Sequence, residues 1–248
     1  MLSGFDLENV ILKASVWALP ILLAITLHEA AHGWAASKLG DPTARLMGRV
    51  TLNPFAHIDP IGTVLIPIGL LMIGAPFVFG YAKPVPVNFS RLRNFRRDMA
   101  LVALAGPASN ILLAIGALAV AHLAPMPSIA NASVAEMVLA ASHPELTNWP
   151  WITSMLLLMI GLNLILAVFN MLPIPPLDGG RILVAVLPDW AAWKVARLER
   201  AGLFIVIGLL FLVPALSREL GYSLDVTGVL IWLPVDALMT VLAVLTGH

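Results

Sequence analysis

Residues 10–37 read VILKASVWALPILLAITLHEAAHGWAAS, an apolar run in which only Lys13 and Glu29 are fully charged. A membrane-spanning helix needs about 20 mostly apolar residues, so this run is long enough to cross a bilayer. The whole chain agrees, because 60% of its 248 residues are hydrophobic and 11% are charged, whereas a soluble domain has roughly 25% charged residues. The sequence therefore predicts an all-α polytopic membrane protein.

Further long apolar segments follow the first one. They are residues 61–80, 99–124, 151–170, 202–216 and 226–246. No repeat and no long hydrophilic stretch separates them, so we expect one membrane-embedded domain over residues 1–248. We expect its catalytic core at about 10–187, with additional C-terminal membrane helices at about 201–246.

The segment 61–80 differs from the other five in composition. It contains four glycines and two prolines, Pro67 and Pro76, which weaken or break a straight helix. We therefore predict that this segment is re-entrant, meaning that it enters the membrane and returns to the same side. About five true transmembrane helices remain.

The distribution of positive charge supports this path. Lys and Arg gather at the cytoplasmic ends of membrane segments. If residues 61–80 are re-entrant, twelve of the fourteen Lys and Arg residues share one side, and only Lys13 and Arg218 lie opposite. If the segment spans, the split is 10 to 4. The prediction is an N-terminus outside and a cytoplasmic C-terminus.

The pattern His28-Glu29-Ala-Ala-His32 predicts a metal site in the first helix. Side chains four residues apart project from the same face of a helix, one turn apart. This spacing suits two ligands of one zinc ion, with Glu29 placed to take a proton from water. Ionisable side chains inside a membrane are costly and usually have a function, so a metal-free structural role is the weaker interpretation.

Zinc needs a third protein ligand, and Asp178 is the best candidate. It follows the span 151–170 in the stretch N170-MLPIPPLDGG-180, where three prolines should end the helix and force an extended path. The two glycines allow close approach of the backbone to a neighbouring element. With residues 61–80 re-entrant, Asp178 falls at the same end of the bundle as the histidines. His57 and Asp59 remain alternative ligands, and the chain has no cysteine.

Three motifs together resemble the site-2 protease family of intramembrane metalloproteases: HEAAH at 28–32, AGPASN at 105–110, and the stretch from Asn170 to Gly180. The stretches G48-RVTLNPFAHIDP-60 and K83-PVPVN-88 resemble a minimal bacterial and archaeal branch that lacks PDZ and CBS domains. The resemblance covers residues 19–187.

The family resemblance implies an intramembrane zinc metalloprotease with one zinc per chain. His28, His32 and Asp178 would be its metal ligands and Glu29 its general base and proton donor. Asn170 would help to bind the substrate strand or stabilise the oxyanion, and Asn110 would serve either the site or helix packing. The resemblance further implies membrane-protein substrates with a transmembrane segment, a bilayer environment, and the prokaryotic cell membrane.

Cleavage of a helical substrate requires a locally extended strand. We therefore expect short β edge strands near the cytoplasmic face, at Arg49–Asn53 and Val85–Val87. The basic run from Arg91 to Arg97 is expected to contact phospholipid. A net charge of zero gives no indication of nucleic-acid binding. The alternatives are a metal-binding transporter, which would more often contain inverted repeats, and an inactive protease relative, which would have lost Glu29 or a ligand.

Overall fold

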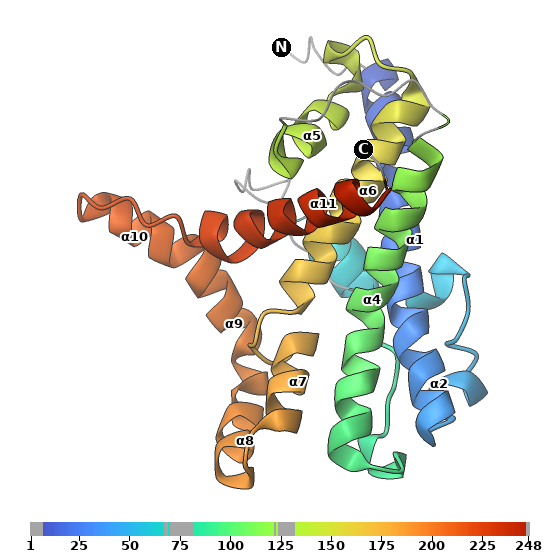
Figure 1. Ribbon diagram of the computed structural model, residues 1–248, viewed down its shortest axis with the longest axis vertical. Helices are drawn as coiled ribbons and strands as arrows, with labels where there is room; N and C mark the ends of the chain where they lie inside the picture. Colours follow the sequence, from blue (N-terminus) through green and yellow to red (C-terminus); the bar gives the residue numbers. More distant parts are fainter. Residues whose placement is uncertain (1–6, 67–68, 70–81, 122, 124–131, 247–248) are drawn as a thin grey trace.

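The structure is a computed structural model that describes residues 7–66, 69, 82–121, 123 and 132–246 (Figure 1). Its α-helices are α1 (Leu7–Leu39), α2 (Thr43–Leu46), α4 (Phe95–Ala121), α5 (Val134–Ala141), α6 (Trp151–Asn170), α7 (Asp178–Val186), α8 (Asp189–Ala196), α9 (Gly202–Ile207), α10 (Val213–Glu219) and α11 (Leu233–Thr246). The 3-10 helices are η1 (Pro54–His57), η3 (Phe89–Arg91), η4 (Pro144–Leu146) and η5 (Arg197–Arg200), and π-helical turns form η2 (Pro60–Leu65), η6 (Gly208–Leu212) and η7 (Gly228–Trp232).

Five helical stretches in the described part of the chain are long and apolar enough to cross a membrane. They are Ile11–Leu39, Phe95–Ala121, Trp151–Asn170, Gly202–Glu219 and Gly228–Thr246. These stretches correspond to five of the six apolar segments in the sequence, which agrees with the prediction of an all-α polytopic protein.

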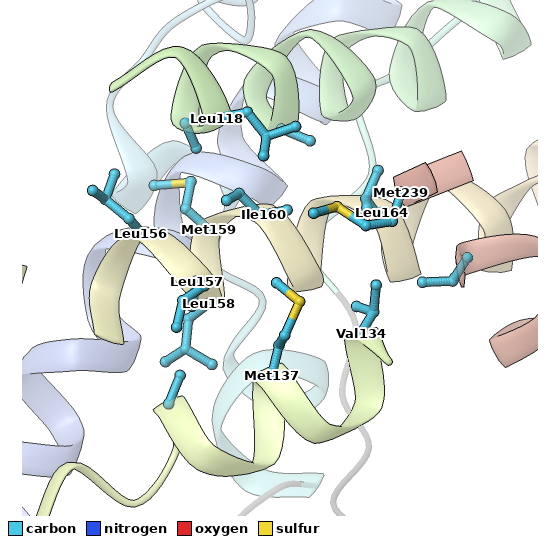
Figure 2. Packing of buried hydrophobic residues seen from close by; sticks show 14 of the residues in the cluster. Leu118, Val134, Met137, Leu156, Leu157, Leu158, Met159, Ile160, Leu164 and Met239 are labelled. Carbon is cyan, nitrogen blue, oxygen red and sulfur yellow. The ribbon is translucent and has the colours of Figure 1, made fainter. Parts of the chain in front are cut away.

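The centre of the protein is a bundle of α1, α4 and α6, which all contact one another. The short helix α5 packs on α6 at Gly161, where an added β-carbon would lie 2.2 Å from Val138 Cγ2. Figure 2 shows this core, with Leu118 of α4, Met137 of α5 and the buried face of α6 in contact. Small residues at such crossings let membrane helices approach closely, which favours packing where lipid offers no hydrophobic driving force.

The C-terminal helices take a different direction from the bundle. In Figure 1, α10 and α11 lie across the long axis of α1, α4 and α6, and α11 crosses α6. A π-helical turn directly precedes each of them, η6 before α10 and η7 before α11. The two stretches are apolar enough to span, but their orientation in the structure differs from that of the central helices.

One end of the bundle carries most of the cationic segments. In Figure 1, α2, the start of α4, α7 and α8 lie at this end, and α5 lies at the other. The Arg93 N–H donates to the Leu39 carbonyl, and the Arg96 guanidinium donates to the Leu187 carbonyl at 2.6 Å. These contacts join the end of α1, the start of α4 and the α7–α8 connection.

The predicted re-entrant path of residues 61–80 falls largely outside the described residues. Its two flanks, however, are described, and they meet. The Lys83 N–H donates to the His57 carbonyl at 2.9 Å, and the Arg49 guanidinium donates to the Lys83 carbonyl at 2.8 Å. The two flanks therefore lie side by side, and the path between them stays a prediction.

The predicted β edge strands are wrong. Neither Arg49–Asn53 nor Val85–Val87 forms a strand, and the described residues contain none elsewhere. Pro84 and Pro86 lack an N–H, and the Val85 N–H donates to a side chain, Glu29 Oε2, rather than to a neighbouring backbone. A strand needs a ladder of hydrogen bonds to a neighbouring backbone. Here the backbone groups form hydrogen bonds with side chains instead.

The connection from α6 to α7 brings Asp178 to the bundle. Helix α6 ends at Asn170, as predicted, but residues 171–177 form turns and bends rather than one extended segment. The glycines are needed for close packing, as predicted. A β-carbon at Gly179 would lie 2.1 Å from the Met171 carbonyl oxygen, and one at Gly180 would lie 2.2 Å from the Pro175 nitrogen.

Candidate metal centre

Three side chains from two distant parts of the sequence converge inside the bundle. His28 and His32 lie one turn apart on α1, and Asp178 lies at the first position of α7. One oxygen of Asp178, Oδ2, lies 3.3 Å from Nε2 of each histidine, and the two Nε2 atoms lie 3.0 Å apart. All three residues are buried, with 5–9% of their surface exposed. They form a group that could hold one metal ion.

The outward nitrogens of both histidines are fixed by hydrogen bonds. His32 Nδ1 lies 2.7 Å from the Val102 carbonyl oxygen, which can only accept, so Nδ1 carries the proton. His28 Nδ1 lies 2.7 Å from Asn110 Oδ1. The amide of Asn110 is oriented by its Nδ2, which donates to the Ala24 carbonyl and to Asn163 Oδ1. Asn110 Oδ1 therefore accepts, and His28 Nδ1 also carries its proton.

The donor set fits a zinc ion. With both Nδ1 atoms protonated, each neutral imidazole directs an Nε2 lone pair at the Asp178 carboxylate. Asp178 Oδ2 is buried and has no hydrogen-bond partner in the described part of the chain. Three electron-rich atoms that face one another repel unless a cation lies between them. A tetrahedral zinc ion with bonds of roughly 2.0–2.1 Å separates its ligand atoms by about 3.3 Å, close to the separations seen here.

Glu29 lies between the two histidines in the sequence and is half-buried. Its Oε2 accepts a hydrogen bond from the Val85 N–H at 2.8 Å. Glu29 is not part of the group of three possible ligands. It is a carboxylate beside a candidate metal site, held by a backbone donor from a separate segment.

Residues 83–88, which we name the strap, carry this donor. The strap lies against the second half of α1. A β-carbon at Gly33 would lie 3.0 Å from Val85 Cγ1. At its far end, the Asn88 N–H donates to Asp41 Oδ2 at 2.6 Å. Burial raises the pKa of the Asp41 carboxyl, but hydrogen bonds from Thr43 and Asn88 outweigh burial and lower it.

The other residues singled out in the sequence lie apart from the three possible ligands. Asn170 Nδ2 donates to the Leu166 carbonyl of its own helix at 3.0 Å. His57 is buried, with Nε2 at 3.1 Å from the Thr51 carbonyl. Asp59 accepts hydrogen bonds from the backbone of residues 61 and 62 at the start of η2. None of these side chains belongs to the possible metal group.

Sequence reasoning missed Asn163, which is fully buried in α6. Its Oδ1 accepts from Asn110, and its Nδ2 donates to the Met159 carbonyl at 2.7 Å. Asn163 thus extends the hydrogen-bond chain from His28 through Asn110 into α6. The signal was present, because an amide in an otherwise apolar span is costly unless it has partners.

Comparisons with known proteins place the chain in a protein family. The model of a family described as Peptidase family M50 matches residues 16–215. "Putative zinc metalloprotease YwhC" of Bacillus subtilis (strain 168) is 39% identical over 195 residues, which are 78% of this chain and 78% of that protein. "Putative zinc metalloprotease Rip2" of Mycolicibacterium smegmatis is 29% identical over 197 residues, which are 79% of this chain and 66% of that protein. The protein of the same name from Mycobacterium tuberculosis (strain H37Rv) is 29% identical over 198 residues, with the same shares. No solved structure matches the chain significantly.

Proposed function

Since the chain belongs to peptidase family M50 and is an intramembrane zinc metalloprotease, we propose that His28, His32 and Asp178 hold its zinc ion. The observation that carries this proposal is the convergence of the two Nε2 atoms and the unpartnered Asp178 Oδ2 in a buried site. When bound, zinc acidifies water and polarises a carbonyl group. The fixed Nδ1 protons of both histidines would orient the rings for this task.

Glu29 is the proton-transfer group in this proposal. It accepts the proton of the water that attacks the scissile carbonyl, and later donates a proton to the nitrogen of the leaving amine. Glu29 directly follows His28 and precedes His32 by three residues, and this position supports the role. In the structure its Oε2 is occupied by the Val85 N–H, which leaves its second oxygen for the proton.

Asn170 is proposed to help bind the substrate strand or to stabilise the oxyanion, which donors in a dry site do well. Its side chain would have to exchange its present acceptor, the Leu166 carbonyl, for the substrate. Asn170 lies at the end of α6, seven residues of turns away from Asp178. This position supports a role beside the site.

The proposed substrates are membrane proteins with a single-span or amphipathic segment, cut near the cytoplasmic end. The location is the prokaryotic cell membrane, with the N-terminus outside and the C-terminus in the cytoplasm. This orientation is supported by the gathering of cationic segments at one end of the bundle, since positive residues favour the cytoplasmic side. The chain is proposed to act as one domain over residues 1–248.

A comparison of two variants tests the zinc and proton roles separately. Glu29→Gln keeps the size of the side chain but cannot accept a proton, so it should retain close to one zinc per chain and lose nearly all turnover. Asp178→Ala removes a ligand and should lose both zinc and turnover. Glu219→Ala, an exposed carboxylate of α10, is the control. Full zinc occupancy in purified Asp178→Ala would show that another group, such as His57 or Asp59, completes the site.

A further inference from the structure

The strap is anchored at both ends by groups other than Glu29. At one end, the Lys83 N–H donates to the His57 carbonyl, and its carbonyl accepts from Arg49 Nη2. At the other end, the Asn88 N–H donates to the Asp41 carboxylate. The middle of the strap therefore has a fixed position that does not depend on the Glu29 side chain.

The middle of the strap offers one hydrogen-bond donor between two prolines. Pro84 and Pro86 have no N–H, so Val85 carries the only backbone donor from residue 84 to residue 86. That N–H contacts Glu29 Oε2 at 2.8 Å. The Val85 side chain is buried, with 8% of its surface exposed, and lies close to Gly33, one turn after Glu29 on α1.

We propose that the backbone N–H of Val85 is a positioning group for Glu29, and this inference rests on the proposed proton-transfer role of that carboxylate. Glutamate has several side-chain torsions, and a free carboxylate would sample many orientations. The fixed donor holds Oε2 and leaves Oε1 as the oxygen that handles the proton. Catalytic groups need placement within about 0.5 Å, and such precision comes from supporting hydrogen bonds.

The decisive variant is Val85→Pro, which removes this N–H and places a ring carbon where its hydrogen was. Residue 85 precedes a proline and is already restricted to extended conformations that proline also adopts. A hydrogen bond to a charged group contributes enough that its loss should lower kcat roughly 10- to 100-fold. KM should change by less than about twofold, and zinc content should stay near one per chain, because Glu29 is not a proposed ligand.

Two matched controls lie in the same strap. Val85→Ala trims the side chain but keeps the N–H, so its loss of kcat should be clearly smaller than that of Val85→Pro. Val87→Pro also adds a proline to the strap, and it removes an N–H that has no partner among the residues described here. This variant should retain kcat near that of the unmodified protein. The readouts are kcat and KM for a model single-span substrate in vesicles, together with zinc content.

Three results would overturn the inference: an unchanged kcat in Val85→Pro, an equal loss in Val87→Pro, or an equal loss in Val85→Ala. If Val85→Pro does not fold, a chain with the α-hydroxy acid analogue of valine at position 85 replaces the N–H by an ester oxygen. The changes expected in kcat, KM and zinc content are the same as for Val85→Pro. Glu29→Gln separates this inference from the proposed function. If Glu29→Gln remains active, the proposed function fails. If it is inactive and the position-85 variants lacking the N–H retain kcat, only the positioning role fails.

Discussion

Gly106 of α4 lies directly against His32 of α1, so that a β-carbon at residue 106 would come within 2.4 Å of His32 Nε2. The same β-carbon would lie 2.6 Å from His28 Cε1. No real β-carbon makes contacts this short, so the glycine is the residue that leaves room for both imidazoles. The packing of α1 on α4 and the proposed metal site therefore depend on the same close approach.

Gly106→Ala should accordingly displace the histidines and reduce zinc content, although alanine is the better helix former. The matched control is Gly116→Ala in the same helix, where an added β-carbon meets nothing within 4 Å. Zinc analysis of the two purified variants, with circular dichroism for helix content, checks this. Equal zinc in both would show that the site can shift to accommodate a methyl group.

Asn163→Leu and Asn110→Leu should both weaken zinc binding, because each interrupts the hydrogen-bond chain that orients His28. Loss of such supporting partners typically costs about 10- to 100-fold in metal affinity. Asn110→Leu should have the larger effect, since Asn110 contacts the imidazole itself. Competition with a zinc chelator measures the affinities. Asn170→Leu is the control, because it should lower turnover while zinc affinity stays unchanged.

Single cysteines test the orientation in the membrane, and the chain contains no cysteine of its own. Cysteines placed near Lys38, Asn88 and Arg197 should share one side, and one near Ser133 should lie on the other. The expectation follows from the contacts that join α1, α4 and the α7–α8 connection at one end. Labelling with an impermeant thiol reagent measures the side of each cysteine. If the cysteine near Asn88 lies on the same side as the one near Ser133, the proposed orientation is wrong.

Substrate segments should be cut near their cytoplasmic ends, because His28 and His32 lie six to ten residues before Lys38, roughly 9–15 Å from the end of the span. Glycine or proline near the cut should increase the rate, since a helix hides its carbonyl groups in its own hydrogen bonds. Mass spectrometry of the products locates the cut. Products from the outer half of the substrate span would exclude this arrangement.

The spanning helices could be predicted from the sequence because a bilayer imposes both a length and an apolar composition on them. The paired position of His28 and His32 follows from helix geometry alone. The position of Asp178 near these histidines required a further argument. The distribution of Lys and Arg predicted that the end of α6 lies at the same end of the bundle as His28 and His32. The directions of α10 and α11 could not be predicted, because lipid solvates an apolar helix equally well in many orientations.

The hydrogen bonds that support the site could not be predicted from the sequence, for a physical reason. The Val102 carbonyl and the Val85 N–H are backbone groups, which every residue or nearly every residue possesses. Their role depends on position and leaves no mark on residue type. The β edge strands were wrongly predicted for a related reason: residues 50–52 form bends, and the Val85 N–H has a side chain, Glu29, as its partner rather than a neighbouring backbone.

The hydrogen bond between Lys83 and His57 joins the two ends of the loop formed by residues 58–82. The entropic cost of closing such a loop grows only by about 0.6 kcal/mol for each doubling of its length. A change in the length of this stretch should therefore cost little free energy and leave the helices that carry His28, His32 and Asp178 in place.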